Sequence, residues 1–139
     1  MNAPLHREMP GAPAWDAAAA LDQIGRQWDG DIVRRLSDYI AIPAKSLAFD
    51  PDWAAHGFID RVVRDAAQWV ESQKVPGLKL EVVRIDGRTP VIFFEIEGTK
   101  AGAAQTVLMY GHLDKQPEFT GWRSDLGPWT PKYEDGKLY

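Results

Sequence analysis

Apolar residues recur at spacings of three and four in two stretches of the chain, a pattern that predicts two amphipathic helices. The first helix is expected to begin at Asp16, with Gly25 as a possible interruption. It should end near Ala41, because Pro43 disfavours helical backbone at the residue before it. Its apolar stripe consists of Trp28, Ile32, Leu36, Tyr39 and Ile40.

The second predicted helix has clear start and stop signals. Asp50 is the expected N-cap, Pro51 takes the first helical position, and residues 74–77 stop the helix. Acidic and basic residues four apart, Asp60 with Arg64 and Arg61 with Asp65, are expected to pair across its turns. The predicted apolar face consists of Phe58, Val62, Ala66, Trp69 and Val70.

Three apolar runs after these helices predict strands at 78–85, 90–97 and 106–112. A turn is expected at 86–89, and the second run is apolar on both faces, which is typical of an interior strand. The chain after residue 112 is rich in proline, glycine and tryptophan, has no sustained periodicity, and predicts a long loop. Its last six residues, EDGKLY, predict a short hairpin.

This order of elements predicts an α/β fold in which two helices pack on a mixed β-sheet. Residues 1–25 are assigned to a mobile N-terminal tail, and residues 26–139 to one domain. No helix follows the third strand to cover the far side of the sheet. We therefore expect a truncated domain, the first part of a larger one.

Composition removes several classes of function. The net charge is −4, and no basic stretch suggests a partner nucleic acid or an anionic membrane. The chain has no cysteine, so disulfides, thiolate metal sites and cysteine nucleophiles are excluded. No apolar run is long enough to span a membrane, and the first fifteen residues do not resemble a signal peptide. These features favour the cytoplasm.

The best candidate for chemistry is the pair His112 and Asp114, at the end of the third predicted strand. In extended chain, positions i and i+2 lie on the same side, roughly 6.5–7 Å apart. A carboxylate at that distance can hold an imidazole so that its other ring nitrogen faces a metal. The alternative is a histidine at a strand end followed by a turn aspartate, because isolated His-x-Asp motifs are common.

The remaining candidates are weaker. His6 lies in the tail and His56 among small and charged residues of the second helix. Glu95 and Glu97 are expected to form the polar edge of a strand. Two alternatives stay open for the loop tryptophans Trp122 and Trp129, which either line a cleft or pin the loop to the body. Four loop carboxylates are further candidate metal ligands: Glu118, Asp125, Glu134 and Asp135, the last of which also fits turn chemistry.

The run VLMYGHLDKQP, followed by GWRSDLGPWTP and EDGKLY, resembles the M20 metallopeptidases, most closely their carnosinase-like dipeptidase branch. The resemblance extends back through GRTPVIFFEIEG and covers roughly residues 28–139. It implies part of a zinc-exopeptidase catalytic domain that hydrolyses small peptides or acyl amino acids by a metal-activated water. By the same resemblance, the full-length parent is expected to form a homodimer. A deacylase or amidohydrolase with the same site, or a non-enzymatic binding domain on the same fold, remain alternatives.

By this resemblance His112 is a ligand to one of two divalent metal ions, usually zinc, with cobalt or manganese as alternatives. Asp114 is the catalytic carboxylate that orients and polarises it. The family's bridging aspartate, glutamate pair and distant histidine would follow Tyr139, and they are not part of this sequence. We therefore expect this chain alone to be inactive. Lys115 stands where the family commonly has a small or branched residue, which leaves its role open.

Overall fold

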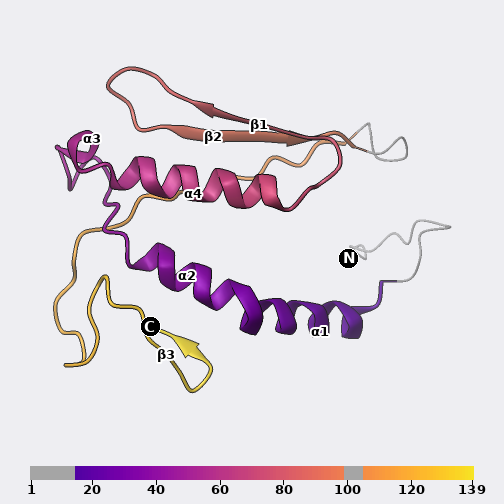
Figure 1. Ribbon diagram of the computed structural model, residues 1–139, viewed down its shortest axis with the longest axis horizontal. Helices are drawn as coiled ribbons and strands as arrows, with labels where there is room; N and C mark the ends of the chain where they lie inside the picture. The colour runs from indigo at the N-terminus through magenta and orange to yellow at the C-terminus, as the bar shows by residue number, and fades with distance from the viewer. Residues whose placement is uncertain (1–14, 99–104) are drawn as a thin grey trace, which may run out of the picture. The chain divides into compact units, whose positions relative to one another are not determined.

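The computed structural model describes residues 15–98 and 105–139. Contacts divide the chain into two compact units, Met1–Arg35 and Leu36–Tyr139. Helices and two small sheets make up the fold, which is therefore mixed α/β (Figure 1). In chain order the elements are α1 (Ala17–Gln27), the π-helical segment η1 (Trp28–Ile32), α2 (Val33–Ile40), α3 (Trp53–His56), α4 (Phe58–Ser72), β1 (Leu78–Val83), β2 (Val91–Ile96), β3 (Tyr133–Glu134) and β4 (Lys137–Leu138).

The first helix starts where the sequence predicts. The Asp16 side chain accepts a hydrogen bond from the Ala19 amide at 3.0 Å, as an N-cap does. Gly25 does not interrupt α1, and the irregularity comes later, in η1. Residues 17–25 were predicted to belong to the tail but are helical. Residues 1–14 lie outside the described residues. The helical run ends at Ile40, before Pro43, as predicted.

The predicted second helix is wrong in its first turns. Gly57 has a φ of +70°, a left-handed conformation that ends α3 and starts α4 in a new direction. Asp50 is not an N-cap, because its carboxylate bonds instead to the ring of His56. Pro51 and Asp52 lie in a turn ahead of α3. Gly57 is visible in the sequence, but a single glycine inside a helical pattern is often tolerated, so it did not by itself predict a break.

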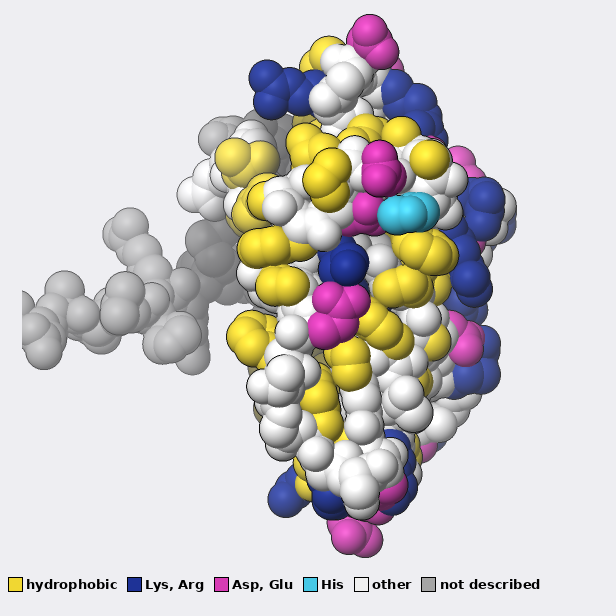
Figure 2. Space-filling view, turned by 90° about the vertical axis from the view of Figure 1, so that its left-hand side faces the viewer, with side chains coloured by type: hydrophobic (Ala, Val, Ile, Leu, Met, Phe, Trp, Pro, Cys, Tyr) yellow, Lys and Arg dark blue, Asp and Glu magenta, His cyan; other side chains and the backbone are white. Residues whose placement is uncertain are grey.

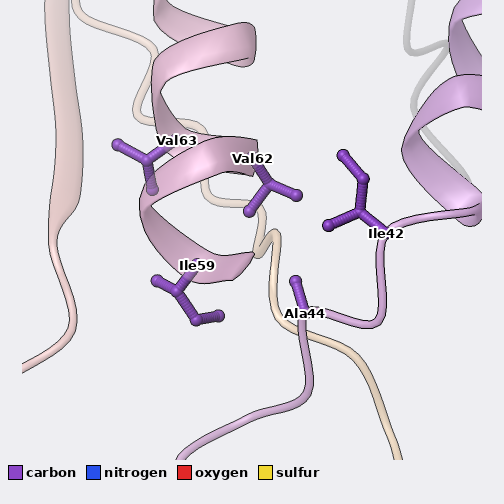
Figure 3. Close-up of a cluster of buried hydrophobic side chains, with 5 residues drawn as sticks. All are labelled: Ile42, Ala44, Ile59, Val62 and Val63. Carbon is purple, nitrogen blue, oxygen red and sulfur yellow. The ribbon is translucent and has the colours of Figure 1, made fainter. Parts of the chain in front are cut away.

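A small core lies where α4 meets the segment that follows α2. Its buried members are Ile42, Ala44, Ile59, Val62 and Val63 (Figure 3). Val62 points toward Ile42 and Ala44, and Val63 points away from them (Figure 3). Val82 of β1 and Ile92 of β2 pack against this cluster, so α4 holds the hairpin and the 42–44 segment together.

The buried face of α4 is rotated from the predicted one. Ile59, Val62, Val63 and Ala67 are buried at spacings of three and four, whereas Trp69 is 41 % exposed. Helix periodicity was therefore right and Phe58 packs against the core, but Trp69 was placed on the wrong stripe because large apolar side chains were assumed to be inside. Of the predicted ion pairs, Arg61 and Asp65 approach to 3.8 Å, while Asp60 pairs with Arg84 across to the hairpin at 2.6 Å.

Strands β1 and β2 form an antiparallel pair whose register runs from Leu78 opposite Ile96 to Val83 opposite Val91. The turn predicted at 86–89 is confirmed, with Gly87 at a φ of +69° and the Arg88 amide bonded to the Ile85 carbonyl. The interior position predicted for the second strand is wrong. Phe93 and Phe94 are 54 % and 48 % exposed, because within the described residues β2 has only β1 beside it.

The third predicted strand is also wrong. Residues 106–112 have no strand assignment, and no backbone hydrogen bond between described residues involves them. Val107, Leu108, Met109 and Tyr110 are between 84 % and 91 % exposed, and we call these four residues the exposed run. A strand needs a neighbour for its amides and carbonyls, which the described part of this chain does not supply to the run. Figure 2 shows one face of the molecule, with hydrophobic side chains between acidic and basic ones.

The predicted mixed sheet is replaced by two separate two-stranded antiparallel sheets. The second of these, β3–β4, confirms the hairpin expected from EDGKLY. Asp135 and Gly136 both have positive φ, at +50° and +73°, as the two central residues of a type I′ turn require. Among the described residues, no helix has the length and apolar character needed to cross a membrane.

Candidate metal centre

The segment carrying His112 and Asp114 is irregular backbone, so the prediction that His112 ends a strand is wrong. Its position is nonetheless defined by neighbours. Leu113 packs against the core cluster, and its carbonyl accepts a hydrogen bond from the Tyr39 hydroxyl at 2.7 Å. The side chain between the two candidate residues therefore faces inward, and both candidates face outward.

The two candidate side chains meet as the sequence predicts. The Nδ1 atom of His112 lies 3.0 Å from Oδ1 of Asp114 and 2.9 Å from the Asp114 backbone carbonyl oxygen. Because both partners are acceptors, Nδ1 carries a proton, and in the neutral ring Nε2 then keeps its lone pair. The side chains are 59 % and 40 % exposed, so the ring is held at an accessible surface. An imidazole in this state can bind a metal ion through Nε2 or accept a proton there.

The structure contains a second histidine–aspartate pair that the sequence did not predict. Nδ1 of His56 lies 2.9 Å from both carboxylate oxygens of Asp50. The Asp50 side chain is only 8 % exposed, whereas that of His56 is 50 % exposed. The six-residue separation across a turn and a short helix has no regular periodicity, so no sequence signal marks the pair. A buried carboxylate needs a partner, and His56 meets that need.

The other candidate carboxylates, apart from Asp135, have basic partners of their own. Glu95 and Glu97 both bond to Lys79 and form the polar edge of the hairpin, as predicted. Glu118 pairs with Lys45 at 3.2 Å, and its pKa lies below the ordinary value because of its own backbone amide and this lysine. Asp135 belongs to the β3–β4 turn.

Asp125 and Glu134 belong to a four-membered charge network with Arg123 and Lys132. Arg123 and then Lys132 hold the pKa of Asp125 well below its ordinary value. Lys132 and then Arg123 lower the pKa of Glu134. These four residues, called the charge network from here on, connect the loop at residues 123–125 to the β3–β4 hairpin. Its carboxylates are engaged with cations and have no hydrogen bond to His112 among the described residues.

The loop tryptophans were expected either to line a cleft or to pin the loop to the body, and the contacts of Trp129 are those of an anchor. Its ring lies 5.3 Å from the ammonium of Lys115, and its indole N–H donates to Glu118 at 3.3 Å. Trp122 is 44 % exposed and donates to the Phe119 carbonyl within the same loop. A groove of about 330 Å³ lies between α4 and β1, but neither His112 nor Asp114 lines it.

The described residues contain no group of three or more potential metal ligands. His112 and Asp114 therefore amount to one oriented imidazole, short of the three protein ligands that a catalytic zinc usually has. His6 lies outside the described residues. No protein-family model matches this chain, and a search of curated proteins finds no significant match.

Proposed function

We propose that this chain carries part of the metal centre of a hydrolase that cleaves dipeptides or related small amides, on part of a zinc-exopeptidase catalytic domain. The observation that carries the proposal is the 3.0 Å contact between His112 Nδ1 and Asp114 Oδ1, which frees Nε2 at an exposed surface. The resemblance of the surrounding sequence to M20 metallopeptidases supports the same assignment.

The residues present fit one ligand position of such a centre. His112 would hold zinc, cobalt or manganese through Nε2, and Asp114 would keep the Nδ1 proton in place and raise the basicity of the ring. When bound, a pair of divalent ions supplies an acidic water and polarises the scissile carbonyl. With one such imidazole, the described residues do not make up a complete catalytic site. We therefore expect negligible hydrolysis from the chain by itself.

A second candidate function is a non-enzymatic interaction domain. The exposed run favours it, because a contiguous apolar segment at the surface commonly marks a binding surface. An M20-type deacylase or amidohydrolase would use the same residues as a dipeptidase, and substrate profiling separates those two.

Zinc titration followed by the ring signals of the histidines tests the proposal. We expect zinc to shift the His112 ring signals, with affinity far below that of complete zinc sites, which hold the metal with about 10–16 kcal/mol. Asp114→Asn should weaken this binding about tenfold, as the loss of a carboxylate behind a ligating histidine commonly does. His56→Ala is the matched control, because it removes the other aspartate-bound imidazole and should leave the His112 response unchanged.

Two results would count against the proposal. A His112 ring that does not respond to zinc at millimolar concentration would remove its basis. Dipeptide hydrolysis by the purified chain that disappears in His112→Ala would support a peptidase but overturn the one-ligand description of the site.

A further inference from the structure

Lys115 follows Asp114 directly, and its ammonium group lies in a cradle of backbone carbonyls. Nζ donates to the carbonyl oxygens of Tyr39 at 2.5 Å, Ile40 at 3.1 Å and Ile42 at 2.5 Å. An ammonium has three N–H donors, so this set of acceptors matches it completely. The first two carbonyls belong to the last turn of α2, and the Tyr39 carbonyl also accepts from the Ile42 amide at 3.1 Å.

Two aromatic rings flank the same ammonium. Nζ lies 4.1 Å from the centre of the Tyr39 ring and 5.3 Å from that of Trp129. Both distances are within the range of cation–π attraction. A lysine at the carboxyl end of a helix is also favoured by the helix dipole. The lysine is thus held from several sides, unlike exposed Lys79, whose partners are two surface carboxylates.

The backbone of Lys115 is fixed as well. Its amide donates to the Ala44 carbonyl at 2.9 Å, and its carbonyl accepts from the Ser46 amide at 2.9 Å, which forms a parallel bridge. On the other side of Asp114, the Leu113 carbonyl is bound by the Tyr39 hydroxyl. Both neighbours of Asp114 are therefore tied to residues 39–46, and the carboxylate has only its own side-chain torsions left to vary.

We propose that Lys115 is a positioning residue for the His112–Asp114 pair: its carbonyl-bound ammonium fixes the backbone on which Asp114 reaches His112 Nδ1. This role deepens the proposed function and rests on it wherever metal binding is concerned. Its effect on the geometry of the pair does not depend on a metal. Without the cradle, the 112–115 segment loses its strongest side-chain anchor, and Asp114 no longer holds the Nδ1 proton continuously.

The tautomer of the His112 ring, read from its ¹⁵N signals at a pH of about 7.5, where an ordinary imidazole is neutral, reports this geometry. In the natural chain we expect the Nδ1–H form. Lys115→Met keeps the aliphatic stem but has no donors, and should shift the ring toward the Nε2–H form that unpaired histidine prefers. Lys115→Arg should restore much of the natural signal. Lys79→Met, at an exposed strand lysine, is the matched control and should change nothing.

Zinc affinity at His112 supplies the second readout, and we expect Lys115→Met to weaken it about tenfold. An unchanged tautomer in folded Lys115→Met, with the natural amide spectrum of α4, would overturn the proposal. If that variant does not fold, Tyr39→Phe removes the anchor at Leu113 and must shift the tautomer in the same direction; no shift there overturns it too. If zinc does not bind at His112 of the natural chain but Lys115→Met still shifts the tautomer, the proposed function is overturned and the positioning role stands.

Discussion

The core cluster and the exposed run are both made of hydrophobic residues, yet one is buried in the structure and the other is exposed. Ile59 in α4 is 4 % exposed, and Leu108 in the exposed run is 91 % exposed. Ile59 has Ile42, Val62 and Val63 as buried neighbours in one cluster, while Leu108 belongs to no such cluster among the described residues. An apolar pattern thus reports a tendency to be buried, but burial also requires a surface that packs against it.

The largest expected effect comes from truncating one side chain of each region. Ile59→Ala should lower the free energy of unfolding by about 2–5 kcal/mol, because it removes buried methyl groups and leaves a cavity. Leu108→Ala should change it by no more than about 0.5 kcal/mol, because the side chain is already in water. Urea unfolding of the two variants measures both values. Equal losses would show that Leu108 is buried in solution.

The exposed run should also cause self-association. It is uncharged, rich in residues that favour strands, and has no backbone hydrogen bond to another described residue, so a second copy can pair with it. We expect the mass from light scattering to rise with concentration, and the charged double substitution Leu108→Lys with Tyr110→Lys to abolish the rise. The same two changes at exposed Leu21 and Ile24 of α1 serve as the control. A natural chain that stays monomeric at tens of micromolar, with one cooperative unfolding transition, would contradict this expectation.

A pH effect on the free energy of unfolding is expected from Lys115, whose ammonium bonds to the carbonyl of Ile42 in the core cluster. Burial lowers the pKa of Lys115 to about 8, below the ordinary value of a lysine in the unfolded chain, about 10.4. Between those values the unfolded state binds more protons than the folded state. The free energy of unfolding should therefore rise with pH, by about 1 kcal/mol once partial solvent exposure is allowed for.

Urea unfolding at pH values from about 8 to about 10 measures this slope. Lys115→Met should remove it, and comparison with this variant cancels the contributions of other groups. One of these is Tyr39, whose pKa is raised by burial and by Asp114 and which matters only at higher pH. A slope that is the same in both proteins would refute the assignment to Lys115.

The smallest effect is expected in the charge network. The pKa of Asp125 is lowered first by Arg123, so its contribution to stability is present above the ordinary aspartate pKa of about 3.9 and is lost as the pH falls below it. Because these groups are exposed, salt should weaken the network as well. Amide signals of β3 and β4 should therefore broaden or shift in acid before those of α4. Asp125→Asn should remove the difference, and Asp135→Asn, at the turn, should not.

Local signals in the sequence predicted those elements that depend on neighbours in the chain. The cap at Asp16, the turn at Gly87 and the hairpin at Asp135 and Gly136 are each determined by a few adjacent residues. The strand expected at 106–112 depends instead on a distant partner, which no local pattern reveals. The break at Gly57 depends on both kinds of information. The glycine is a local signal, but its conformation also depends on how the helices on either side pack.

For the candidate site, the contact of His112 with Asp114 followed from their i, i+2 spacing. The role of Lys115 did not, because its acceptors are backbone carbonyls more than seventy residues away, and every residue has a carbonyl. The pair of His56 with Asp50 also escaped prediction, since only the packing of a short turn brings them together. Metal binding by His112 remains a prediction for the titration.

The bond from Tyr39 to Leu113 joins residues 74 apart in sequence, and this has a consequence for the order of folding. The β1–β2 and β3–β4 hairpins close short loops and can form early, whereas joining residues 39–46 to 113–115 costs the entropy of closing a long loop. We infer that the segment bearing His112 and Asp114 docks late, after α4 has its hairpin. In pulse-labelling hydrogen exchange, the Lys115 amide should gain protection after the amides of β1 and β2.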